Sequence, residues 1–125
     1  MGKNNLLKYG KIPGDEEFRD GKRIWKTARL IELSKDIPEF DLHLNSIDIS
    51  VMPWANVRSE DVRLLDVLHH IERVNNANLN YPVLVMPCGY VCNGWHRIAK
   101  AILRGKETVK AKRFEKMPEP DEIRG

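Results

Sequence analysis

The pattern of apolar and polar positions predicts two amphipathic helices. The first follows Ser59-Glu60-Asp61, a sequence typical of a helix start, because an N-cap serine precedes two acidic residues. Apolar side chains recur after it at helical spacing and predict one buried stripe of Leu64, Val67, Leu68, Ile71 and Val74. Asn75 and Asn76 predict its end, since asparagine tolerates the left-handed conformation at a helix terminus.

The second helix is expected from about Trp95 to Arg104. Its buried stripe is predicted to consist of Trp95, Ile98, Ala99 and Ile102. Another face is expected to carry His96, Lys100 and Arg104. Gly105 suits the left-handed exit from this helix.

Shorter segments predict β-strands. The run from Trp25 to Leu33 is predicted as the first ordered strand, and residues 82–86 as a buried strand that turns and returns at 90–92. Alternation of apolar and polar positions predicts extended segments at Phe40, Leu42 and Leu44, at Ile47, Ile49 and Val51, and from Thr108 to Phe114.

Together these elements predict an α/β (α+β) fold, in which a small mixed β-sheet packs with two main helices. At 125 residues the chain is long enough for one core. The polar residues 1–23 are expected to form a flexible arm, 24–116 the folded domain, and 117–125 a loose tail.

Composition sets limits on location and partners. The net charge is +3, with 42% hydrophobic and 31% charged residues, which permits contact with nucleic acid without demanding it. No apolar run is long enough for a membrane span, and no signal-peptide pattern is present, so we expect a cytoplasmic protein without a membrane partner. Cys88 and Cys92 have no second pair or suitably spaced histidine, and are expected to be small half-buried residues rather than zinc ligands.

The strongest candidate chemistry lies at the start of the second helix. Gly94, His96 and Arg97 fall in its first turn. A helix start exposes unpaired N–H groups and carries a partial positive charge, which suits an anion. Arg97 and a protonated His96 would oppose the helix dipole unless something negative bound there. The pattern therefore predicts a phosphate-binding site, with a nucleotide as the expected ligand.

The sequence N-G-W-H-R-I-A-K-A, followed by L-R-G-K-E-T-V-K-A, resembles the phosphate-binding segment of the ParB/sulfiredoxin superfamily, where many members carry D-G-x-H-R. The likeness extends from His70 to Asp121. It implies a ParB/sulfiredoxin-like fold, in which Gly94 lets the backbone approach phosphates and His96 and Arg97 grip them. It also implies a nucleoside triphosphate, ATP or CTP, with Mg²⁺ as a further candidate cofactor.

Departures from the family pattern narrow what the resemblance implies. Trp95 stands where sulfiredoxin has its reactive cysteine, so reduction of sulfinic acid is not expected. Asn93 replaces the usual aspartate: the chain is a binding-only member if that carboxylate acts in catalysis, whereas asparagine serves equally well if it only caps the turn. No helix-turn-helix follows, which argues against chromosome segregation.

Several further residues are candidates for the predicted phosphate site, and some of them have an alternative role. Packing is the preferred role of Trp95, and stacking on a base is the other. Lys100 is expected to help neutralise phosphate charge, and the resemblance favours His70 and Arg73 as residues that approach the pocket from the first helix. An acid that orients an acceptor would come from Asp48, Asp41, Glu60 or Asp61, and the sequence does not choose among them.

The first helix also invites a metal interpretation, because His69 and His70 lie near Asp66 and Glu72. Only two of these four side chains share one helical face, whereas a zinc site needs three or four ligands. A solvated helix face is therefore the favoured interpretation.

Three functions remain open on the sequence alone, and so does whether the chain is an enzyme. One is a nucleotide-dependent phosphotransferase or NTPase. Another is a non-catalytic nucleotide sensor, which Asn93 favours. The third is a DNA-binding or nuclease module, for which the chain offers a basic patch of Arg104, Lys106, Lys110, Lys112 and Arg113. Protection of an exposed edge strand explains these cations equally well.

Overall fold

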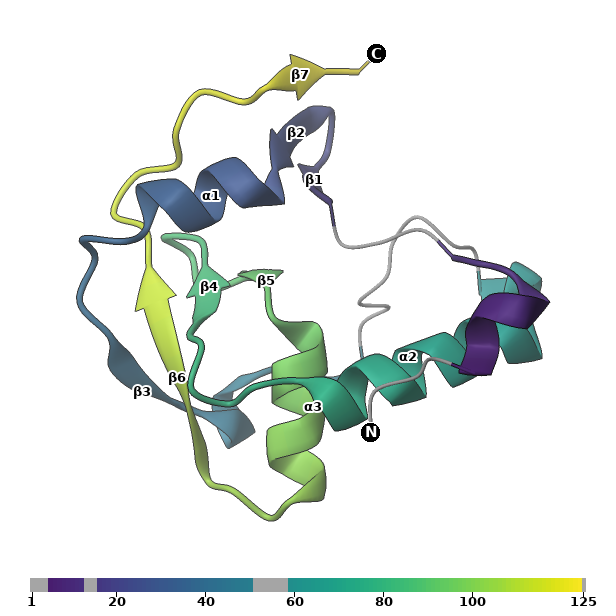
Figure 1. Cartoon of the computed structure of the whole chain (residues 1–125). Coiled ribbons are helices and arrows are strands. Elements are labelled where there is room, and N and C mark those ends of the chain that lie inside the picture. The colour runs from purple at the N-terminus through teal and green to yellow at the C-terminus, as the bar shows by residue number, and fades with distance from the viewer. Residues whose placement is uncertain (1–4, 13–15, 51–58, 125) are drawn as a thin grey trace.

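The computed structural model describes residues 5–12, 16–50 and 59–124 (Figure 1). The predicted α+β class is confirmed, because helices and two β-sheets share one small fold. The helices within the described residues are α1 (Thr27–Leu33), α2 (Leu64–Asn76) and α3 (Trp95–Leu103), with short 3-10 turns at η1 (Asn5–Tyr9), η2 (Leu44–Ser46) and η3 (Ser59–Asp61). The strands are β1 (Glu17–Asp20), β2 (Arg23–Lys26), β3 (Phe40–His43), β4 (Val83–Val85), β5 (Val91–Asn93), β6 (Thr108–Arg113) and β7 (Glu122–Ile123).

The larger sheet has four strands in the order β3-β6-β4-β5 and is mixed, as predicted. β4 and β6 run parallel, whereas β3 pairs with β6, and β5 with β4, in the antiparallel sense. The chain passes from β4 through β5 and α3 before it enters β6, because parallel neighbours need a long connection. This crossover places the start of α3 directly after β5.

Both faces of the larger sheet are covered. Successive side chains of a strand point to opposite faces, so Val83 and Val85 lie in one apolar cluster and Leu84 in the other. The first cluster lies between the sheet and α3 and contains Leu44, Val83, Val85, Val91, Ile98, Ala101, Val109 and Ala111. The second lies beneath α1 and the β1–β2 hairpin and contains Phe18, Trp25, Leu30, Leu84, Met86, Cys92 and Phe114. Burial on both faces explains why residues 82–86 read as a continuous apolar run.

The predicted strand from Trp25 to Leu33 is wrong for most of its length. The chain is extended only through Lys26, and residues 27–33 form α1. Leu30 is fully buried, whereas Ile31 and Leu33 are exposed, which is the one-sided burial of a short helix. Strong helix formers outweigh the strand-like apolar content of this segment.

The predicted extension through Ile47, Ile49 and Val51 is also wrong in its described part. Residues 47–50 form no strand, and Ile49 is exposed. The carboxylate of Asp48 accepts hydrogen bonds from the backbone N–H and the hydroxyl of Ser50, and such a local turn competes with strand pairing. Val51 lies outside the described residues.

The tail packs on the body instead of hanging loose. β7 pairs with β2 in a three-stranded sheet of order β1-β2-β7. The indole N–H of Trp25 donates to the Pro118 carbonyl at 2.8 Å, and the Asp121 carboxylate accepts from the Lys26 N–H at 2.8 Å. The arm expected at residues 1–23 likewise contains η1 and β1. The three-part division of the chain stays a prediction.

α2 begins later than predicted, and a different face of the helix is buried. Ser59–Asp61 forms a separate 3-10 turn, and the helix starts at Leu64, where the Asp66 carboxylate accepts the Arg63 N–H at 2.8 Å. Of the predicted buried stripe only Val74 is buried, while Leu64, Val67, Leu68 and Ile71 are exposed. The buried positions include Asp66 and His69 instead.

The left-handed end predicted for this helix is wrong as well. Ala77 follows α2 in an extended conformation, and the described residues with positive φ are all glycines. By contrast, the left-handed exit predicted after α3 is confirmed, since Gly105 has φ 73°.

Candidate functional site

Gly94 shapes the start of α3. It has φ 114°, a conformation that residues with a side chain rarely adopt. A Cβ here would lie 2.9 Å from Cγ2 and 3.2 Å from Cα of Val83, so β4 lies directly against this backbone. The Gly94 carbonyl accepts the Ile98 N–H at 3.0 Å, which starts the helix. Glycine is therefore required both by the backbone conformation and by the close approach of β4.

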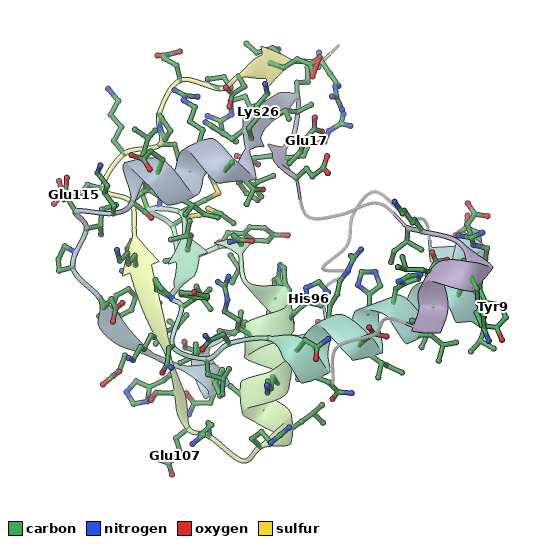
Figure 2. The ribbon with its side chains drawn as sticks, viewed as in Figure 1. Tyr9, Glu17, Lys26, His96, Glu107 and Glu115 are labelled. Atoms are coloured by element: carbon green, nitrogen blue, oxygen red, sulfur yellow. The ribbon has the colours of Figure 1, made fainter. Side chains whose placement is uncertain are left out.

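His96 and His70 form the polar contact between α3 and α2. Nε2 of His96 lies 2.9 Å from Nδ1 of His70, and the ring planes differ by 16°. Figure 2 shows His96 at the end of α3 that meets α2. His96 is buried, with 9% of its surface exposed, although the predicted buried stripe of this helix did not include it. One ring nitrogen of the pair must donate and the other accept, which makes the two imidazoles a site where a proton can be shared.

Arg97 is directed along the neighbouring loop. Its Nη1 donates to the Pro82 carbonyl at 2.8 Å, and its guanidinium carbon lies 5.9 Å from the ring centroid of Tyr81. These contacts tie the first turn of α3 to the segment that leads into β4. The sequence could not predict the bond between Arg97 and Pro82, because every residue has a backbone carbonyl and the acceptor therefore leaves no mark in the sequence.

Lys100 caps α2. Its Nζ donates to the carbonyls of Asn75 at 2.9 Å and Ala77 at 2.7 Å. The last carbonyls of a helix have no intrahelical partner, and a cation at this end also complements the helix dipole. The ammonium expected to neutralise phosphate therefore has a structural role.

His70 contacts His96 at the start of α3, whereas Arg73 lies at a separate cavity. The prediction that these residues approach a phosphate stays a prediction. Arg73 lines a cavity of about 420 Å³ between the N-terminal segment and α2. Its other lining residues are Leu7, Lys11, Ile12, His69, Glu72 and Asn76, and none of residues 93–100 lines it. Nε2 of His69 lies 2.9 Å from the Gly10 carbonyl at this cavity.

The two adjacent histidines of α2 thus leave the helix toward different partners, His69 toward the N-terminal segment and His70 toward α3. Asp66 is engaged by Arg63, and these hydrogen bonds, first that of the side chain and then that of the backbone, lower the pKa of Asp66. In the part of the chain that the structure describes, no three side chains of His, Cys, Asp or Glu gather as metal ligands would.

The four candidate acids come from different parts of the fold. Asp41 on β3 lies opposite Lys110 on β6. The strands β6 and β4 separate β3 from β5, the strand that leads into α3. Asp48 is engaged by Ser50, whose hydroxyl, followed by its backbone N–H, lowers the pKa of the carboxyl. Glu60 and Asp61 lie in η3, ahead of α2.

Asn93 and Trp95 flank Gly94. Asn93 ends β5 opposite Leu84 on β4. Trp95 is half-buried and packs against the apolar cluster beneath α3, so packing accounts for the placement of its ring. Ala101 is buried in place of the expected Ile102, because α3 is turned so that its inner face meets the sheet.

The predicted basic patch is divided by the fold. Nζ of Lys112 donates to the carbonyls of Ser34 at 3.0 Å and Lys35 at 3.3 Å, beside the end of α1. The Arg113 guanidinium lies 5.4 Å from the ring centroid of Phe40. Because β6 lies between β3 and β4, the explanation of these cations as edge-strand protection is wrong. Arg104, Lys106 and Lys110 are exposed.

The two cysteines differ in environment. Cys88 is exposed in the turn after β4, whereas Cys92 is buried on β5. Burial raises the pKa of the Cys92 thiol to about 12, so it stays protonated near neutral pH. The expectation of two half-buried residues is wrong for both.

No protein-family model matches the chain, and neither a curated protein nor a solved structure matches it. The resemblance to the ParB/sulfiredoxin superfamily therefore stays a prediction. Within the described residues, no helix is both long and apolar enough to cross a membrane.

Proposed function

We propose that the chain binds the phosphate groups of a nucleotide at the start of α3. The observation that carries the proposal is the contact between His96, in the first turn of α3, and His70 of α2 at 2.9 Å. It brings two ionisable rings to a helix terminus that already favours an anion.

The backbone supplies the first part of such a site. The N–H groups at the start of an α-helix have no partner within the helix and point along its axis. At this helix start, Gly94 keeps the entering chain free of a side chain. Phosphate oxygens are good acceptors for converging N–H groups of this kind.

The histidine pair supplies a charge that depends on the ligand. When both rings are neutral, one donates to the other; when one proton is added, an imidazolium donates to a neutral imidazole, and such charge-assisted bonds are the stronger ones. A bound phosphate favours this positive form. The protonated form of the pair is therefore the form expected to hold a phosphate.

Arg97 and Lys100 support the site in different ways. Arg97 comes from the same turn and ties it to Pro82, and its guanidinium is suited to phosphate oxygens. Lys100 holds α2 at the position from which His70 reaches His96. The nucleotide is ATP or CTP, with Mg²⁺ as its counter-ion. Transfer or hydrolysis of the terminal phosphate is the enzymatic form of this proposal, and nucleotide sensing the non-catalytic form.

Isothermal titration calorimetry with ATP, CTP and pyrophosphate, with and without Mg²⁺, tests the proposal. We expect one of these ligands to bind. In His70→Asn the affinity is expected to fall about tenfold, because the partner that stabilises a charged His96 is lost, which is roughly the energy of one charge-assisted hydrogen bond.

His43→Asn is the matched control, since His43 is exposed on β3. Its binding should equal that of the wild type. Absence of binding by all three ligands to folded wild-type protein would contradict the proposal. Equal affinity of the wild type and His70→Asn would instead show that the phosphates bind elsewhere.

A further inference from the structure

The outer face of α2 carries a row of apolar side chains that the body of the protein leaves exposed. Leu64 is 73% exposed and Ile71 is 50% exposed, and Val67 and Leu68 lie between them on the same face. A contiguous apolar row on the exposed face of a helix marks a candidate interaction surface.

The helix cannot bury this row by turning about its own axis. His69 is bonded to Gly10 on one side, and His70 to His96 on the other. The Lys100 ammonium fixes the end of the helix through two carbonyls. These polar contacts hold the apolar face away from α3 and η1.

We propose that this face pairs with the same face of a second copy of the chain, with the two α2 helices antiparallel about a two-fold axis. The row is suited to this arrangement, because it has the same spacing when it is followed from either end. An antiparallel pair centred between Val67 and Leu68 places Leu64 opposite Ile71 of the second copy, and Val67 opposite Leu68. An interface about a two-fold axis uses one patch on both copies, as this row requires.

The charges at the two ends of α2 favour the same direction. The turn before the helix contains Glu60 and Asp61, and the far end is capped by the Lys100 ammonium. In an antiparallel pair, the acidic end of each α2 helix lies beside the basic end of the other. The two helix dipoles then point in opposite directions, which is favourable. A parallel pair would bring like ends together.

The size of the row sets the expected strength. Four side chains on a helix of 13 residues cover less than the roughly 800 Å² per partner of a standard stable interface. Association is therefore weak, with a dissociation constant on the order of tens of micromolar. The experiment must reach concentrations well above that value.

Sedimentation velocity at protein concentrations from about 5 to 500 µM measures this association. The wild type is expected to change from monomer to dimer across the range. Ile71→Glu is expected to raise the dissociation constant at least tenfold, since it places a charge at both ends of the two-fold row. Leu103→Glu is the control, because Leu103 is 76% exposed but lies on α3, and it should associate as the wild type does.

Disulfide trapping tests the direction of pairing, in a Cys88→Ser background that removes the exposed native thiol. Leu64→Cys and Ile71→Cys proteins are expected to crosslink when mixed and not when oxidised alone, because like positions lie about 10 Å apart along the antiparallel pair. Faster crosslinking of each variant alone would overturn the antiparallel arrangement. A wild type that stays monomeric at every concentration would overturn the whole proposal.

Discussion

The two-sided sheet and the helix α2 are held in place by different forces. The sheet packs α3 on one face and α1 with the β1–β2 hairpin on the other, and each interface is an apolar cluster. α2 extends away from both sheets (Figure 1) and contributes Val74 as its buried apolar residue. Its ties to α3 include polar ones, namely the His70–His96 contact and the hydrogen bonds from Lys100 to the Asn75 and Ala77 carbonyls.

This difference matters because the two kinds of contact contribute unequal free energies. Burial of a large apolar side chain contributes roughly 1.5–3 kcal/mol, whereas a hydrogen bond contributes about 1 kcal/mol net. The sheet should therefore behave as the stable unit and α2 as an element that opens on its own. The proposed phosphate site lies where the two regions meet, so that movement of α2 would change the contact between His70 and His96.

A pair of identical substitutions gives the largest expected contrast. Leu30→Ala removes a fully buried side chain beneath the sheet and is expected to lower the free energy of unfolding by about 2–5 kcal/mol. Leu64→Ala truncates a side chain that is 73% exposed on α2 and should change it by about 0.5 kcal/mol or less. Urea denaturation of both variants, at micromolar concentration to keep copies apart, measures the difference.

Comparable losses in the two leucine variants would contradict the division into two regions. A large loss for Leu64→Ala alone would mean that α2 is part of the main core. The slope of the unfolding transition serves as a check, because it should stay at the wild-type value if the same surface becomes exposed.

Two lysines whose ammonium groups donate to backbone carbonyls near a helix end, one in each region, are expected to show a smaller difference when substituted. Lys100 caps the end of α2, and Lys112 donates to the carbonyls of Ser34 and Lys35 beside the end of α1. Lys100→Met is expected to make opening of α2 easier by about 1–2 kcal/mol. Amide exchange along α2 should then be roughly five- to thirtyfold faster, with exchange in β4 and β6 unchanged.

Lys112→Met is the matched variant on the body. Its effect should appear in α1 and in the global stability rather than in α2, because α1 covers the second apolar cluster. Hydrogen exchange followed residue by residue separates the two outcomes. If Lys100→Met instead accelerated exchange in the sheet strands to the same degree, α2 and the sheet would open as one unit.

The two regions also differ in how well the sequence predicted them. In the sheet, local pattern and final environment agree: residues 83–86 of the predicted strand are buried, and β6 follows the expected alternation at Val109 and Ala111. In α2 the pattern identified a helix but assigned its apolar face to the core. Helical spacing fixes which side chains share a face, and it does not say which face meets the body.

The site was predictable to the extent that it is local. Gly94 and the helix start could be recognised from neighbouring residues, because a tight strand-to-helix turn favours glycine. The distance between His70 and His96 could not, since 26 positions separate them and no periodicity links them. The role of Lys100 was missed for the same reason, because its acceptors are backbone carbonyls of another helix.

Lowering the pH should produce the smallest difference between α2 and the sheet, and this difference should be confined to the start of α2. Asp66 accepts the Arg63 N–H and is bonded by the Arg63 side chain, and these hydrogen bonds lower its pKa. A carboxyl whose pKa is lower in the folded protein stabilises the fold fully above its unfolded pKa of about 3.9, and this contribution is lost as the pH falls through the folded value. The first turn of α2 should therefore weaken below about pH 4, before the apolar clusters of the sheet respond.

Asp66→Asn removes the ionisation, and the variant should resemble the wild type in strong acid but show a less ordered start of α2 at pH 7. The ¹³Cα shifts of α2, recorded from pH 7 to about pH 2.5 for both proteins, measure this, with β4 as the internal reference. If the α2 shifts of the two proteins become equal in acid while the β4 shifts stay unchanged, the result supports a helix α2 that responds separately from the sheet. A difference that persists at the lowest pH, or that extends into β4, would mean that Asp66 acts through packing shared with the body.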